Sequence, residues 1–260
     1  MSAITDSGHN RPGESCFNDD IDWNRLDSHL YYKKNYATLH QNDLEFVAEV
    51  RDFLVEQLQG RSGLSGVDVG AGANLYPSLT MLPFCADLTL LDCSSSNITW
   101  LNREIDDYST AWNPFWTVLA EEPTYAAIDQ PREAIRDRAR TEEASVFRLP
   151  PDRWDLGTMF FVAESISSEL TEFRAAVAGF ISALKPGSPF ALAFMENSDG
   201  WSVGPREFPA VRVCEVDIAG SLPPDTEILR LCKLGVGMDP IRDGYTGMIL
   251  VCGKKLVTES

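Results

Sequence analysis

The sequence predicts an α/β protein built on a doubly wound, mostly parallel sheet. Short apolar segments that look like buried strands alternate with helix-length amphipathic segments, as in repeated strand-helix-strand units. A glycine-containing turn, VDVGAGANLYPSL at residues 67–79, connects the first of these strands to its helix. The last two strand-like segments follow each other closely, so we expect them to close the sheet in antiparallel fashion.

Length and composition fit a globular protein that binds a small molecule. The 260 residues are 44% apolar and 10% aromatic, enough for a large core. No run approaches the roughly 18 apolar residues of a membrane helix, so no membrane partner is expected. The net charge of −17 opposes binding to phosphate backbones, so no nucleic-acid partner is expected either. We expect a monomer or a weak homodimer.

Neither the cysteines nor the acidic residues indicate a metal site. The six cysteines are scattered and form no C-x-x-C pair, which predicts reduced thiols and a cytoplasmic location. The acidic cluster at Asp19, Asp20 and Asp22 is followed by Arg25 and Tyr31 at the positions where a calcium loop has its glycine and last glutamate. We therefore expect no bound metal.

The chain is expected to begin with a tail and a helical segment. Residues 1–20 are mostly polar and predict a flexible tail. Residues 21–65 carry apolar and aromatic residues at helical spacing and predict an N-terminal helical lid. Residues 66–260 then form the ligand-binding domain.

Within that domain the elements follow in a regular order. The strands at 67–69 and 88–91, with a helix-length segment at 75–83 between them, form a parallel βαβ unit. The segment 102–144 is longer than the connection requires, and we expect it to be an insertion that caps the site. It includes the helix-like QPREAIRDRART at 130–141.

The second half repeats the alternation. A strand within 154–165, an amphipathic helix at 168–184 and a strand at 188–196 continue the sheet. The segments 227–237 and 248–256 are the two strands expected to close it.

The glycine turn points to an adenosine ligand without phosphates. Gly70 and Gly72 follow the first strand, where an open α/β sheet binds its ligand. A dinucleotide fingerprint needs a third glycine at the position of Leu75, which disfavours a dehydrogenase. Asp92 ends the next strand, 20 residues after Gly72, where a carboxylate accepts hydrogen bonds from a ribose. S-adenosylmethionine meets this description.

Several stretches, in order along the chain, resemble one family. Two N-terminal tyrosines are followed by DVGAGANLY, LLDCSSSN, AWNPFW, GWSVGPREF and DGYTGMILVCGKKL. From about Tyr31 to the C-terminus the chain resembles the nicotinamide, phenylethanolamine and indolethylamine N-methyltransferases. It also resembles a group of actinobacterial methyltransferase-like proteins with the stretches VDVGAGANLYP, FFVAES and FMENS. The resemblance implies the Rossmann-like class I methyltransferase fold, with a seven-stranded, mostly parallel sheet, an antiparallel last strand and an N-terminal helical lid.

The resemblance also implies a set of site residues. S-adenosylmethionine would be held by residues of the tyrosine pair, the glycine turn and the ends of the second and third predicted strands: Tyr31, Tyr36, Asp68, Gly70, Gly72, Asn74, Tyr76, Asp92, Asn97 and Phe161. Trp201, with Tyr36 and Glu196, would bind the substrate.

An amine acceptor must lose a proton before it attacks the methyl group. Glu164 and Glu196 each follow a strand beside the expected cofactor site, and either carboxylate could receive that proton, directly or through water. Asp199 and Asp243 are weaker candidates for the same role. The leading prediction is a methyltransferase acting on a small amine-bearing metabolite.

Two alternatives use the same cofactor differently. If Trp112, Trp116 and Trp201 leave room for the cofactor alone, its own amino group could displace methylthioadenosine and form azetidine-2-carboxylate. A third possibility is a regulator that binds the cofactor without catalysis, which would expose a large apolar patch for a partner.

Overall fold

The computed structural model describes residues 15–236, 242 and 244–257. Its seven-stranded sheet has the order β3-β2-β1-β4-β5-β9-β8. The strands are β1 (Leu64–Val69), β2 (Cys85–Asp92), β3 (Ala139–Glu143), β4 (Leu156–Phe160), β5 (Pro189–Glu196), β8 (Thr226–Gly235) and β9 (Gly247–Lys255). Neighbouring strands from β3 to β5 are parallel, and β9 is antiparallel to both β5 and β8. The predicted fold class, with its antiparallel last strand, is confirmed.

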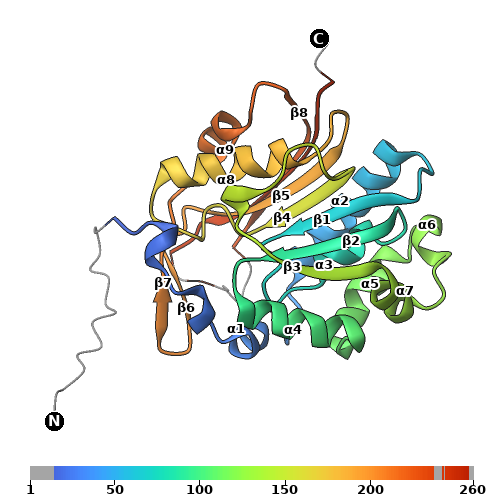
Figure 1. Cartoon of the computed structure of the whole chain (residues 1–260), viewed down its shortest axis with the longest axis horizontal. Helices are drawn as coiled ribbons and strands as arrows, with labels where there is room; N and C mark the ends of the chain where they lie inside the picture. The colour runs from blue at the N-terminus through green and yellow to red at the C-terminus, as the bar shows by residue number, and fades with distance from the viewer. Residues whose placement is uncertain (1–14, 237–241, 243, 258–260) are drawn as a thin grey trace.

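Helices cover both faces of the sheet (Figure 1). One face carries α8 (Leu170–Ala183) and α9 (Glu215–Ser221), and, within the described residues, the other carries six further helices. These are α2 (Gln41–Leu58), α3 (Tyr76–Met81), α4 (Ser95–Asp106), α5 (Asn113–Leu119), α6 (Pro123–Ala126) and α7 (Pro131–Arg138). Since side chains of a strand alternate between faces, β5 places Phe190, Leu192 and Phe194 in one core and Ala191 and Ala193 in the other. This two-sided burial explains why the strand reads as one apolar run.

The seventh strand lies where the sequence predicted only an insertion. Residues 139–143 form β3, the edge strand that pairs in parallel with β2. Its sequence, ARTEE, has no apolar run, and none of its residues is fully buried. The strand is held by backbone pairing at the edge, which hydrophobic patterning does not reveal.

The chain before β1 comprises η1 (Asn18–Asp20), η2 (Trp23–Arg25), α1 (Ser28–Asn35) and α2. The first three lie at the carboxyl ends of the central strands, whereas α2 packs on one face of the sheet. Residues 1–14 of the predicted tail are outside the described residues, while Asn18 donates its backbone N–H to Glu172 of α8. Residues 21–31 pack against the hairpin of β6 (Trp201–Val203) and β7 (Arg206–Phe208). In the part of the chain that the structure describes, no helix is long and apolar enough to cross a membrane.

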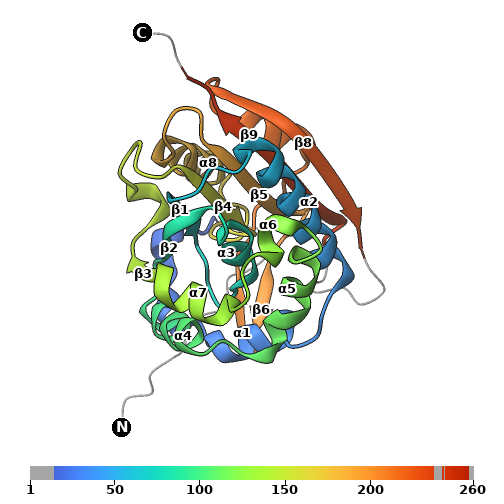
Figure 2. The same ribbon diagram turned by 90° about the vertical axis from the view of Figure 1, so that its right-hand side faces the viewer.

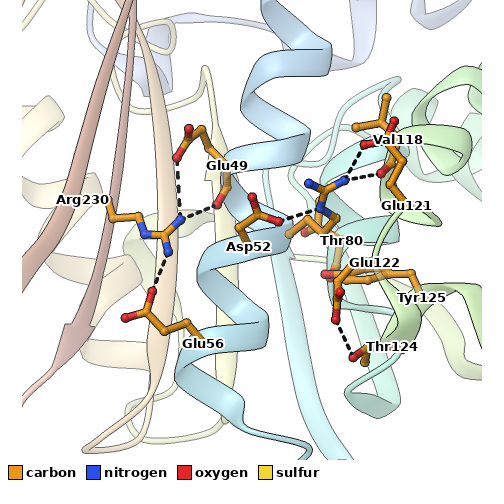
Figure 3. A network of polar contacts seen from close by, with 11 residues as sticks. Glu49, Asp52, Glu56, Thr80, Val118, Glu121, Glu122, Thr124, Tyr125 and Arg230 are labelled. Carbon is orange, nitrogen blue, oxygen red and sulfur yellow. Dashed lines mark hydrogen bonds and ion pairs between the residues drawn. The ribbon is translucent and has the colours of Figure 1, made fainter.

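Helix α2 is fixed to its neighbours on both sides. Arg230 of β8 pairs with Glu56 at 2.5 Å, and its Nη1 lies 3.7 Å from a Glu49 carboxylate oxygen (Figure 3). On the other side Arg51 donates to the carbonyl of Val118 at 2.5 Å and to Glu121 at 3.0 Å. Figure 2 shows α2 between β8 and α5. These contacts make α2 a fixed wall behind the pocket described next.

Candidate active site

A pocket of about 900 Å³, its open mouth included, lies at the carboxyl ends of β1, β2 and β4. The glycine turn forms its floor, and α1, the β6–β7 hairpin and the segment before β9 contribute walls. Most residues predicted for the cofactor line it: Tyr31, Tyr36, Asp68, Gly70, Gly72, Asn74, Asp92, Asn97 and Phe161. Trp201, predicted for the substrate, lines it as well.

The glycine turn has a backbone that only glycine adopts easily. Gly70 and Gly72 have φ values of +66° and +60°. A Cβ added at Gly70 would lie 2.6 Å from the Cγ2 atom of Val162, the residue that follows Phe161 after β4. Gly70 therefore allows the two strand ends to approach each other at the floor of the pocket.

We predict that Gly70→Ala destabilises the protein more than Gly60→Ala does. Both glycines have positive φ, but a Cβ at Gly60 would meet nothing within 4 Å. The strained backbone costs about 1–3 kcal/mol in each variant, and overpacking against Val162 adds about 1–3 kcal/mol in Gly70→Ala alone. Thermal unfolding of both variants should show the lower Tm for Gly70→Ala. Equal Tm values would mean that Val162 moves aside without cost.

Hydrogen bonds hold the carboxylate of Asp92 against the glycine turn. Its Oδ2 accepts the backbone N–H of Gly72 at 2.8 Å, and its Oδ1 accepts the N–H of Ser94 at 2.8 Å and the side-chain amide of Asn97 at 3.1 Å. Burial raises the pKa of Asp92, while these hydrogen bonds lower it. Asn97 in turn accepts a hydrogen bond from Ser28 of α1 at 2.7 Å. The carboxylate is thus oriented into the pocket by the turn, by α4 and by α1.

Asp68 lies deeper in the floor and is held by two hydroxyl groups. Ser78 and Thr158 donate to its two carboxylate oxygens, each at 2.8 Å. Burial raises the pKa of Asp68 to about 7, although both hydrogen bonds oppose the shift.

The two predicted tyrosines lie together on the pocket wall. Their rings make an edge contact at 6.0 Å, and burial raises the pKa of both hydroxyls. Phe161 lines the same wall in a left-handed backbone conformation, with φ of +60°. Such strain in a residue other than glycine is typical of functional sites. Tyr76 lies elsewhere: it stacks on Phe115 behind the pocket and donates to Asp43 at 3.0 Å.

The two predicted catalytic carboxylates have different surroundings. Glu164 is fully buried, and its Oε1 accepts the backbone N–H of Met195 at 3.0 Å and the hydroxyl of Ser165 at 3.2 Å. Its Oε2 is buried without a hydrogen-bond partner among the described residues. Burial raises the pKa of Glu164, and the charge of Arg242 counteracts that shift. Ser165 and Arg242 line the pocket, whereas Glu164 stands directly behind them.

Glu196 uses both carboxylate oxygens in other contacts. Lys233 pairs with Oε1 and Thr246 donates to Oε2, both at 2.6 Å. Glu196 does not line the pocket. Of the weaker candidates, Asp199 pairs with Arg212 on the surface at 2.7 Å, and Asp243 lies outside the described residues.

Trp201 forms the aromatic wall of the pocket. It begins β6, stacks on Phe208 with ring centroids 4.3 Å apart, and donates its indole N–H to the carbonyl of Ser165 at 3.0 Å. Trp112 and Trp116 do not line the pocket, and Trp112 is buried with its indole N–H bound to Glu104. The pocket is therefore not enclosed by the three tryptophans, an arrangement that would have favoured the cyclase alternative.

Sequence reasoning missed two charged residues near the site. Arg242 is buried and lines the pocket. It also lines a smaller adjoining chamber, together with Tyr31, Tyr36, Phe161 and the buried Asp43. The burial of Asp43 could have been predicted from the sequence. It lies three, four and seven residues before Phe46, Val47 and Val50, which places it on the apolar face of α2.

The fold and the site together define a class I S-adenosylmethionine-dependent methyltransferase. The sheet order supplies the fold, and a glycine turn bound to a carboxylate at the end of β2 supplies the cofactor site. The chain belongs to the NNMT/PNMT/TEMT family, whose model matches residues 18–256.

Known proteins agree with this assignment. Indolethylamine N-methyltransferase of Oryctolagus cuniculus is 27% identical over an alignment 184 residues long, which covers 63% of this chain and 68% of that protein. Magnesium protoporphyrin IX methyltransferase (ChlM) from Synechocystis PCC 6803 shares the fold, with a TM-score of 0.58, 13% identity and coverage of 88% and 92% of the two chains. N-methyltransferase NodS from Bradyrhizobium japonicum WM9 gives a TM-score of 0.53 at 12% identity, with coverage of 88% and 99%. These relatives favour neither the cyclase nor the regulator.

Proposed function

We propose that the protein transfers the methyl group of S-adenosylmethionine to the nitrogen of a small amine. The observation that carries the proposal is the division of the pocket into two ends. Asp92 and the glycine turn lie at the ends of β2 and β1, while Trp201, Ser165 and Arg242 lie beyond β4, with Glu164 behind them. The indolethylamine N-methyltransferase relative supports an amine acceptor.

The floor of the pocket fits the cofactor. Asp92 is only 5% exposed but belongs to the pocket lining, so its carboxylate can accept hydrogen bonds from ribose hydroxyls. A Cβ at Gly72 would meet only the Gly70 carbonyl oxygen, at 3.7 Å, so the absence of a side chain at Gly72 leaves room for the methionine portion to approach the backbone. Tyr31, Tyr36 and Phe161 line the same pocket and would enclose the bound cofactor. When bound, the cofactor supplies an activated methyl group on a positively charged sulfur.

The protein contributes mainly orientation to such a transfer. Trp201 and the tyrosine pair would hold the acceptor nitrogen in line with the methyl carbon, and correct orientation can supply about 7–11 kcal/mol of barrier reduction. Glu164 would attract the ammonium form of the acceptor and receive its proton, directly or through water. Its second oxygen, Oε2, is buried and has no hydrogen-bond partner among the described residues, so it is the oxygen that we propose receives the proton.

A product assay tests the proposal. Purified protein is incubated with S-adenosylmethionine alone and with pooled amine metabolites, and both nucleoside products are followed by mass spectrometry. S-adenosylhomocysteine that forms only when an amine is present supports methyl transfer. Methylthioadenosine that forms without an acceptor, faster than the spontaneous reaction, would contradict it in favour of the cyclase.

We predict that Glu164→Gln lowers kcat by about 10²- to 10⁴-fold and leaves the Kd of S-adenosylmethionine nearly unchanged, because general-base assistance is lost without a change in size. Glu196→Gln should keep kcat within a few-fold, since Lys233 and Thr246 already occupy the Glu196 carboxylate. Steady-state kinetics and calorimetry measure both effects. A Glu164→Gln enzyme with full turnover would exclude Glu164 as the proton acceptor.

We also place the enzyme in the cytoplasm. All six cysteines are free thiols in the structure, which supports a reducing compartment.

A further inference from the structure

Arg242 is a buried cation at the acceptor end of the pocket. Arg242 is 8% exposed, and its Nη1 donates to the hydroxyls of Ser165 at 2.9 Å and Ser198 at 3.5 Å. The guanidinium carbon lies 5.5 Å from the centre of the Trp201 ring. Arginine is rarely buried to this extent unless a partner compensates its charge.

The protein supplies only indirect compensation. Among the described residues, the Arg242 guanidinium donates to the hydroxyls of Ser165 and Ser198 and forms no ion pair with a carboxylate. The buried Glu164 is connected to it through one hydroxyl, because Ser165 accepts from Arg242 and donates to Glu164. The other ionisable residues that line the adjoining chamber with Arg242 are Tyr31, Tyr36 and Asp43. The hydrogen-bond partners of Arg242 are therefore neutral groups, the hydroxyls of Ser165, Ser198 and Tyr31. Within the part of the chain that the structure describes, the N–H edge of the guanidinium has no bidentate anionic partner.

The position of Arg242 assigns it to the acceptor. Asp92 and the glycine turn lie at the ends of β2 and β1, whereas Arg242 binds Ser165 after β4 and Ser198 after β5. Trp201 and Arg242 line the pocket on the side of β4 and β5, away from Asp92 at the end of β2. A methyl acceptor must approach the methyl carbon from the side opposite the leaving sulfur, and we assign the Trp201 and Arg242 side to the acceptor.

Charge balance then constrains the acceptor. A simple ammonium compound would enter a site that already holds the guanidinium of Arg242 and the sulfonium of the cofactor, with Glu164 as the buried counter-charge directly behind the wall. Positive charges that are held close together in a buried site repel each other strongly. A carboxylate on the acceptor would remove the excess positive charge and pair with the guanidinium in the bidentate geometry that arginine favours.

We propose, on the basis of the proposed function, that the acceptor is an amino acid or a related amine that carries a carboxylate, and that Arg242 binds this carboxylate. Trp201 packs against the body of the acceptor, and Glu164 attracts its ammonium group. Arg242 is thereby the residue that selects amino acids over the corresponding simple amines.

The experiment compares matched pairs of acceptors: the proteinogenic amino acids and the amines formed from them by decarboxylation, such as tryptophan with tryptamine. Wild-type protein should prefer the carboxylate-bearing member of the productive pair by at least about tenfold in kcat/KM, as expected for a charged hydrogen-bonded contact. Arg242→Gln should bring that ratio close to one. Arg242→Lys, which keeps the charge but not the bidentate geometry, should fall between them.

Two controls show whether a lower preference for the carboxylate-bearing acceptor comes from the loss of its contact with Arg242. Arg212→Gln removes a surface arginine whose side chain is 64% exposed and should leave the ratio unchanged. Calorimetry with S-adenosylhomocysteine should give the same Kd for wild type and Arg242→Gln, and thermal unfolding checks that each variant is folded. A large loss of S-adenosylhomocysteine affinity in folded Arg242→Gln would overturn the inference, because the carboxylate bound by Arg242 would then be that of the cofactor.

The remaining outcomes separate this inference from the proposed function. Methylation of amines without a preference for the carboxylate overturns the role of Arg242 but supports N-methyl transfer. If no pair is methylated, the same compounds are titrated into protein saturated with S-adenosylhomocysteine. Carboxylate-dependent binding that Arg242→Gln abolishes supports the inference while the proposed reaction fails, and absence of such binding overturns the inference.

Discussion

Asp92→Ala should weaken the binding of S-adenosylmethionine by at least about tenfold and up to about a hundredfold. The carboxylate lines the pocket at the end of β2, and a hydrogen bond to a charged group contributes about 1.5–3 kcal/mol. The substitution also removes the acceptor for the backbone N–H of Gly72, so the turn loses the contact that fixes it. Calorimetric titration with S-adenosylmethionine or S-adenosylhomocysteine measures the change directly.

Two further variants separate the ribose contact from damage to the turn. Asp92→Asn keeps one oxygen acceptor at nearly the same size, so it should bind with intermediate affinity. Asp87→Ala removes another carboxylate from β2, one that pairs with Arg140 at the sheet surface, and should leave the affinity unchanged. If Asp92→Ala bound the cofactor as tightly as wild type, Asp92 would have no contact with the ribose.

The parts of the fold that could be predicted from sequence are those with strong local patterns. The apolar runs of β4 and β5 are visible because helices cover both faces of the sheet. The edge strand β3 was missed because residues 139–143 are held by pairing with β2 and have no apolar run. The helix α7 before it was predicted as part of the charged, helix-like segment 130–141, but the last three residues of that segment belong to β3.

The site residues that could be predicted are likewise those with a local sequence pattern. Gly70, Gly72 and Asp92 could be predicted because one turn and a fixed spacing of 20 residues bring them together, as the hydrogen bond from Gly72 to Asp92 shows. Arg242 could not, since its burial depends on contacts with Ser165 and Ser198, which are 77 and 44 residues away in sequence. An arginine between two strands usually lies in a solvated turn.

Asp43→Asn should make the protein more stable above pH 7 and change little near pH 4. Asp43 is 2% exposed on the core face of α2, and burial raises its pKa from 3.8 to about 7, against the opposing hydrogen bond from Tyr76. A carboxyl group whose pKa is higher in the folded state contributes stability below its unfolded pKa. That stability is lost as the pH rises through the folded pKa. A shift of about three units corresponds to roughly 4 kcal/mol.

The measurement is urea unfolding of wild type and Asp43→Asn at several pH values from 4 to 8. Asp68 carries a similar shift in both proteins, so the difference between their unfolding free energies isolates Asp43. Tyr76→Phe provides a second comparison, because loss of its hydrogen bond should raise the pKa of Asp43 further and extend the pH dependence upward. A constant difference between wild type and Asp43→Asn across this range would show that Asp43 is ionised in the folded protein. The adjoining chamber would then hold a negative charge opposite Arg242, and the charge balance that favours a carboxylate on the acceptor would be weaker.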